Sequence, residues 1–117
     1  MNVLAAVLVG LVGALHVYFL VLEMFLWTTP TGRRVFGTDA EFAEQSKALA
    51  ANQGLYNGFL VAGLVWGLVA ERTDVQVFFL VCVVVAGLYG AATVNRRILL
   101  VQAVPALLAL AAVLAAR

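Results

Sequence analysis

Apolar residues form four long runs along this chain, and a polar stretch separates each run from the next. The runs cover about residues 2–27, 50–70, 75–94 and 97–116. Each has close to the roughly 20 apolar residues that an α-helix needs to cross the hydrocarbon core of a bilayer. The pattern therefore predicts four transmembrane helices.

Two of the polar stretches are very short. Residues 71–74 separate the second run from the third, and residues 95–97 separate the third from the fourth. Such connections join only antiparallel neighbours. We expect an all-α fold in which residues 1–117 form a single domain, a four-helix antiparallel transmembrane bundle.

The long connection, residues 28–49, holds most of the water-facing residues. Pro30 and Gly32 are expected to end the first helix in a turn. Thr38 and Glu41 have capping-box spacing, which predicts that a helix begins there. Apolar residues such as Phe42 and Leu49 favour an amphipathic segment on the cytoplasmic membrane surface that leads into the second span.

The distribution of Lys and Arg predicts the orientation, because these residues are retained on the cytoplasmic side. Five of the seven would lie at one end of the bundle and two at the other. We expect the end with five to be cytoplasmic and both termini to lie outside. The five are Arg33, Arg34, Lys47, Arg96 and Arg97, and the two are Arg72 and Arg117.

Composition supports lipid as the solvent of this chain. Of 117 residues, 65% are hydrophobic and 11% charged, and the mean hydropathy is +1.07. A net charge of +1, with no basic run longer than two arginines, speaks against a nucleic-acid partner. The single cysteine, Cys82, excludes an intramolecular disulfide.

Several polar residues fall inside the predicted spans, where such groups are costly unless they have a partner or a function. His16 and Glu23 are seven positions apart and share one face of the first span. Glu23, Asn57, Tyr89 and Gln102 each lie about one to two turns from the cytoplasmic boundary, and His16 lies deeper. This agreement in depth across four helices predicts a shared polar site.

Other polar residues lie at the same end of the second and third spans. The full candidate set for binding a ligand or proton is His16, Glu23, Asn52, Gln53, Tyr56, Asn57, Tyr89, Thr93 and Gln102.

Local patterns in the third and fourth spans extend this expectation. Cys82, Ala86, Tyr89 and Thr93 fall on one face of the third span, which we expect to face the bundle. Pro105 should bend the fourth span and free a backbone carbonyl near the site.

Two glycine pairs in the second span have the spacing that lets membrane helices approach closely. Gly54 and Gly58 face nearly opposite to Gly63 and Gly67. One pair would pack within the chain and the other against a second copy in a homodimer. Packing of both pairs within the chain is the alternative.

The chemistry of Glu23 has two interpretations. It is either structural, bonded to Asn57 or Gln102, or it is a desolvated carboxylic acid that exchanges a proton near neutral pH. A metal site is not expected, since His16 and Glu23 provide only two ligands. No glycine-rich phosphate loop, nucleophile elbow or thiol pair occurs, so no cofactor is expected and no catalytic residue is assigned.

Four segments carry a resemblance to a known family: residues 15–19, 22–27, 52–58 and 87–90, which read LHVYF, LEMFLW, NQGLYNG and GLYG. They resemble domain-of-unknown-function family 1304, small bacterial membrane proteins. The resemblance implies four helices in the bacterial inner membrane and brings no activity. The carboxylate in the first helix is also loosely similar to that of small multidrug-resistance exporters, which work as dimers.

Three functions stay open. The leading hypothesis is a polar, titratable cavity on the cytoplasmic side that binds a small molecule or ion, with proton-coupled transport as its most concrete form. The second is a membrane-embedded enzyme acting on a lipid or apolar metabolite, with Glu23 and His16 as acid and base. The third is a structural subunit of a membrane complex.

Overall fold

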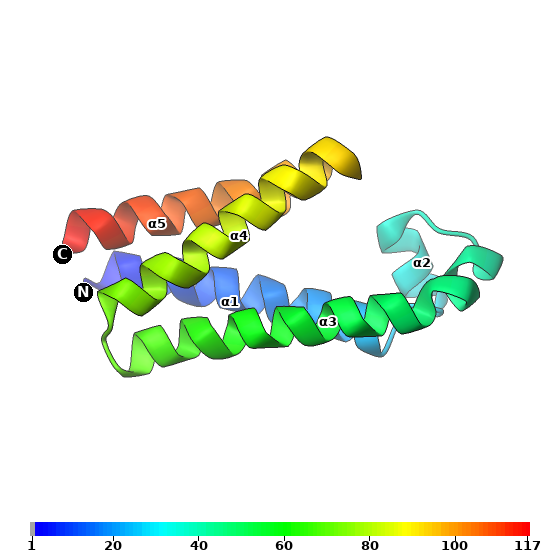
Figure 1. Cartoon of the computed structure of the whole chain (residues 1–117), viewed down its shortest axis with the longest axis horizontal. Helices are drawn as coiled ribbons and strands as arrows, with labels where there is room; N and C mark the ends of the chain where they lie inside the picture. Colours follow the sequence, from blue (N-terminus) through cyan, green and yellow to red (C-terminus); the bar gives the residue numbers. More distant parts are fainter. Residues whose placement is uncertain (1) are drawn as a thin grey trace. The chain divides into compact units, whose positions relative to one another are not determined.

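The computed structural model describes residues 2–117, and this part of the chain is helical without β-strands. The prediction of an all-α fold is therefore confirmed. The elements are α1 (Val3–Met24), α2 (Pro30–Phe36), α3 (Ala40–Val69), α4 (Thr73–Thr93), the π-helix η1 (Leu99–Ala103) and α5 (Val104–Ala116) (Figure 1).

Three segments are long and apolar enough to cross a membrane, namely Val3–Met24, Thr73–Thr93 and Leu99–Ala116. They coincide with three of the four predicted spans. The remaining one, residues 50–70, lies within the 30-residue helix α3. The first turns of α3 carry polar residues, which lower the mean hydropathy of this helix. That α3 crosses the membrane stays a prediction.

The start of α3 differs by one residue from the predicted cap. The Asp39 carboxylate accepts a hydrogen bond of 2.7 Å from the amide of Phe42, which makes Asp39 the N-cap. The prediction that Thr38 caps this helix was wrong, because the chain enters the helix one residue later. The Thr38 hydroxyl is buried and has no hydrogen-bond partner among the described residues.

The turn after α1 also begins a helix that was not predicted. α1 ends at Met24, three residues earlier than expected, and Pro30 is the first residue of α2. The Thr29 hydroxyl accepts a 3.2 Å bond from the Gly32 amide, and proline is favoured at a first helical position. Gly37 ends α2 in the left-handed conformation, with φ of 68°.

Contacts divide the chain into two compact units. The first comprises the described residues of Met1–Ala14 together with Leu60–Arg117, and the second comprises Leu15–Phe59.

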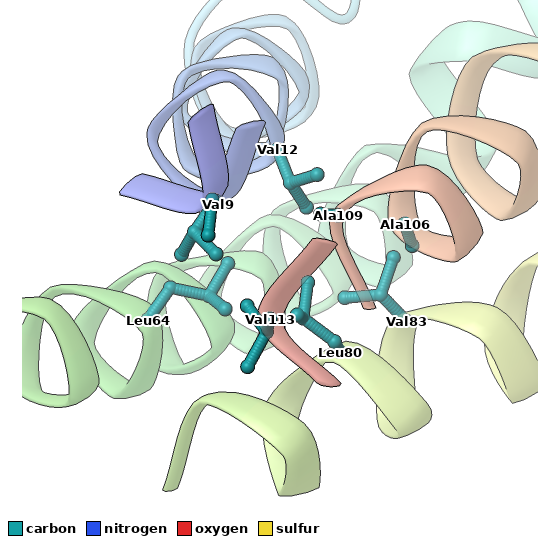
Figure 2. Close-up of a cluster of buried hydrophobic side chains, with 9 residues drawn as sticks. Val9, Val12, Leu64, Leu80, Val83, Ala106, Ala109 and Val113 are labelled. Atoms are coloured by element: carbon teal, nitrogen blue, oxygen red, sulfur yellow. The ribbon is translucent and has the colours of Figure 1, made fainter. Parts of the chain in front are cut away.

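An apolar core holds the first unit together. Buried side chains from the start of α1, the end of α3, α4 and α5 point toward one another in Figure 2. Three members of this core are fully buried alanines, which allow the helices to approach closely. The core comprises Ala5, Val9, Val12, Leu64, Leu80, Val83, Ala106, Ala109 and Val113.

Within this unit α4 and α5 run antiparallel, as the short connection predicted (Figure 1). The α-helical hydrogen-bond pattern is interrupted before Pro105. The Val104 amide donates to the Leu99 carbonyl, five residues back, which closes a π-turn. Proline was expected to bend this span. The structure accommodates the missing amide by a π-helix over Leu99–Ala103 instead.

Candidate functional site

The second unit contains a close contact between the end of α1 and the first half of α3. A methyl group on Gly54 would lie 2.5 Å from the Cγ of Met24 and 3.3 Å from the Leu20 carbonyl oxygen. One on Gly58 would lie 3.1 Å from the Cδ1 of Leu20. Glycine at these two positions therefore allows α3 to lie directly against α1.

A hydrogen bond between two polar side chains joins the helices at this contact. The side-chain amide of Asn57 on α3 donates through Nδ2 to the Oε1 of Glu23 on α1. Asn57 is only 5% exposed, whereas Glu23 is half-buried. The two residues that were predicted to share a level in the membrane are thus in contact.

His16 lies in the same unit, seven residues before Glu23 on α1. Its side chain is fully buried, and its ring meets that of Phe19 edge-on, with centroids 5.3 Å apart. Two titratable groups and one amide are therefore held on the paired stretches of α1 and α3.

The other candidates on α3 do not point into this contact. Asn52 and Gln53 are exposed. Tyr56 is also exposed, and its ring contacts that of Phe59 on its own helix. The rotational setting of α3, fixed by Gly54 and Gly58, directs Asn57 toward α1 and turns these three residues away.

The candidates on α4 and α5 belong to the first unit. Tyr89 is 72% exposed, and the hydroxyl of exposed Thr93 donates to the Tyr89 carbonyl at 2.7 Å. Gln102 on η1 is half-buried. The convergence of these residues with Glu23 stays a prediction.

The face of α4 that packs into the core of the first unit differs from the one that was expected to point into the bundle. The buried positions of α4 are Val75, Gln76, Leu80, Val83 and Gly87. The stripe through Cys82, Ala86, Tyr89 and Thr93 is therefore not part of the core of the first unit. Three residues of this stripe line a shallow apolar groove together with three neighbours on α4. The groove is lined by Phe78, Val81, Cys82, Val85, Ala86 and Tyr89.

Sequence reasoning missed one buried polar residue, Gln76. Its Nε2 donates a 2.8 Å bond to the Gly67 carbonyl, across the turn from α3 to α4. Its Oε1 is buried without a partner among the described residues. The signal was a polar residue in the first turn of an apolar span, four positions after Arg72.

Both glycine pairs of α3 contact their own chain. A side chain on Gly63 would collide with the ring of Phe79, and one on Gly67 would lie 2.7 Å from the Cγ of Gln76. Together with the contacts of Gly54 and Gly58, this favours the alternative in which both pairs serve packing within the chain.

The arrangement brings together a carboxylate and an amide that form a hydrogen bond, and an imidazole on the same helix as the carboxylate. Among the described residues, no group of three or more His, Cys, Asp or Glu side chains is placed to hold a metal ion.

Comparisons with known proteins give a family and no activity. The family model described as "Protein of unknown function (DUF1304)" matches residues 10–114. The "Uncharacterized protein YpaA" of Lactococcus lactis subsp. lactis (strain IL1403) is 33% identical over 114 residues, covering 94% of this chain and 96% of that protein. No solved structure matches the chain.

Proposed function

The chain belongs to the DUF1304 family of proteins of unknown function, and we propose that it is a membrane protein in which Glu23, with Asn57 and His16, binds and releases a proton. Proton-coupled movement of a small molecule or ion is the function that we propose for this site. Its membrane is the bacterial inner membrane, and its site opens toward the cytoplasm.

The observation that carries the proposal is the hydrogen bond from Asn57 to Glu23. A carboxylate has acceptor sites for about four hydrogen bonds, and Asn57 provides one donor. The remaining capacity of this half-buried group is open to a proton, a cation or a ligand with N–H or O–H donors. When the carboxylic acid is protonated, it gains an O–H donor and changes what it can bind.

His16 supports the proposal as a second titratable group. It lies seven residues from Glu23, which corresponds to about 10 Å along the axis of α1 and nearly the same face. Imidazole changes charge near neutral pH more readily than any other unperturbed side chain. A proton or a ligand that leaves Glu23 therefore has a second acceptor deeper in the membrane.

The proposed site does not define the surface through which two copies of the chain would pair. Gly54, Gly58, Gly63 and Gly67 pack within the chain, so a homodimer would form through a different face.

Infrared difference spectroscopy across a pH step tests proton binding without knowledge of the transported molecule. We expect the protein in lipid vesicles to show a carboxylic acid C=O band that Glu23→Gln removes. The glutamine keeps an oxygen that can accept from Asn57, so circular dichroism should report the same helix content. The control is Glu71→Gln, which removes an exposed carboxylate from the turn after α3 and should leave the band unchanged.

Transport is tested by proton entry into vesicles that hold a pH-sensitive dye, driven by a potassium diffusion potential. Wild-type protein should acidify the lumen faster than empty vesicles do, and Glu23→Gln should reduce the rate to that of empty vesicles. A titrating band without flux would leave proton binding and contradict movement of protons through the site without a co-transported molecule. The absence of a Glu23 band would leave the structural interpretation of this hydrogen bond.

A further inference from the structure

The helix α2 follows closely after the end of a candidate membrane span. α1, which is long and apolar enough to cross the membrane, ends at Met24, and α2 begins at Pro30. The five residues between them span at most about 18 Å. The ring of Trp27 packs at a tilt against that of Phe36 on α2, with centroids 4.8 Å apart, and aromatic residues are enriched at the membrane interface.

α2 carries two arginines that lack an acidic partner. The ion pairs among the described residues are Lys47–Glu44 and Arg72–Asp74, so Arg33 and Arg34 take part in neither. The acidic residues nearby in sequence bond within α3: Asp39 accepts from the Phe42 amide, Glu41 from Gln45 and Glu44 from Lys47.

Two buried polar atoms of the same segment also lack partners. The Nε of Arg33 and the hydroxyl oxygen of Thr38 are covered and make no hydrogen bond among the described residues. The backbone brings these residues together, since the Thr38 amide donates to the Arg33 carbonyl at 3.0 Å. Buried polar groups in native proteins nearly always find a partner, so these two indicate an acceptor that the protein itself does not supply.

We propose that Arg33, Arg34 and Thr38 bind the phosphate of an anionic phospholipid. A guanidinium offers paired N–H donors that match phosphate oxygens, and a hydroxyl donates a further bond. Both Arg33 and Thr38 are half-buried rather than enclosed, so a change of rotamer exposes the covered atom to an anion.

Two observations favour a lipid phosphate for this site: the Nε of Arg33 has no partner among the described residues, and α2 begins shortly after the end of α1. A basic residue in the last turn of a helix also interacts favourably with the helix dipole, and both arginines lie in the last turn of α2. The interaction with the helix dipole accounts for two positive charges at this end of α2, but it supplies no hydrogen-bond acceptor for the Nε of Arg33. The location beside the end of α1 provides lipid phosphates in high local concentration. This inference does not depend on proton binding by Glu23.

Native mass spectrometry of the full chain, titrated with phosphatidylglycerol or phosphatidylcholine in detergent, tests the site. We expect phosphatidylglycerol to bind more tightly. The double variant Arg33→Gln/Arg34→Gln should weaken that binding by about tenfold or more. The matched control is Arg96→Gln/Arg97→Gln, which removes the same charge from the exposed turn between α4 and η1 and should have little effect.

Milder variants separate binding from folding. Arg33→Lys keeps the charge but loses the planar donor pair, and Thr38→Val keeps the shape but loses the hydroxyl. Each should weaken phosphatidylglycerol binding while the helix content by circular dichroism stays unchanged. Equal losses from both arginine pairs would overturn the proposal in favour of diffuse attraction. Competition by inorganic phosphate as strong as that of the lipid would overturn the assignment to a lipid.

Discussion

Asn57 is the residue through which α3 contacts the carboxylate of α1. We expect Asn57→Ala to lower the free energy of unfolding by about 0.6–1.7 kcal/mol, the range measured for hydrogen bonds between membrane helices. Thermal unfolding in detergent would measure the change. Asn52→Ala removes an exposed amide from the same helix and should have a much smaller effect. Equal effects would show that the bond to Glu23 adds no stability.

Asp39 begins α3, and its substitution tests the position of the cap. Asp39→Ala removes the acceptor for the Phe42 amide and should destabilise the first turn by about 1 kcal/mol. Hydrogen exchange at the amides of Phe42 and Ala43 would rise accordingly. Thr38→Ala removes a hydroxyl that makes no hydrogen bond and should leave these amides protected. The opposite result would restore Thr38 as the cap.

Residue types and their depth along the helices predicted the candidate polar groups, and their common level made Asn57 and Gln102 the two expected partners of Glu23. Depth does not determine the direction in which a side chain points. That direction follows from the close packing of Gly54 and Gly58 on α1, which turns Asn52, Gln53 and Tyr56 outward. Such packing depends on the partner helix and cannot be derived from a single span.

The contact of α4 with the π-helix η1 depends on Gly87. A methyl group at this position would lie 2.8 Å from the Ala103 amide nitrogen and 2.9 Å from its Cβ. Since backbone cannot move aside easily, we expect Gly87→Ala to destabilise the protein by about 1–3 kcal/mol. Thermal unfolding in detergent would measure it.

The control for this contact is a glycine with free space around it. A methyl group on Gly10 of α1 would meet no atom within 4 Å, so Gly10→Ala should be neutral or stabilising by up to about 1 kcal/mol. Destabilisation by both substitutions would mean that the close approach of α4 to η1 is not the cause.

At the scale of elements, the apolar runs predicted α1, α4 and the combined segment of η1 and α5 to within a few residues. The pattern could not predict α2, because Thr29 and Pro30 occur both where helices end and where they begin. It also could not predict that the helix adopts a π-turn before Pro105. A missing amide can be accommodated by a bend or by a wider turn, and neighbouring helices decide between them.

The number of membrane crossings, and the side on which each terminus lies, depend on whether α3 crosses the membrane. With 30 residues, α3 is about 45 Å long, which exceeds the hydrocarbon core. Arg72, in the turn that follows, lies 5.8 Å from the Trp66 ring, and its hydrogen bonds to Asp74 raise the pKa of its guanidinium. Because a charged guanidinium and a tryptophan both favour the membrane interface, we expect the end of α3 to lie at a water boundary.

If α3 is the fourth span, an even number of crossings places both termini on the same side. Five of the seven Lys and Arg residues lie in the connections 28–49 and 95–97, which are therefore expected to be cytoplasmic. The termini, at the opposite ends of the spans, are then expected outside. We expect alkaline phosphatase, which is active outside the cytoplasm, to be active when fused at either terminus. A fluorescent protein that matures only in the cytoplasm should be dark at both.

An internal fusion provides the complementary readout and links topology to the site. Alkaline phosphatase inserted in the turn after α2 should be inactive, because this segment is expected to be cytoplasmic. Termini on opposite sides would mean three crossings, with α3 outside the hydrocarbon core. The carboxylate of Glu23 would then pair with Asn57 at the water boundary, where desolvation is weak, and the physical basis for proton exchange in the membrane would be removed.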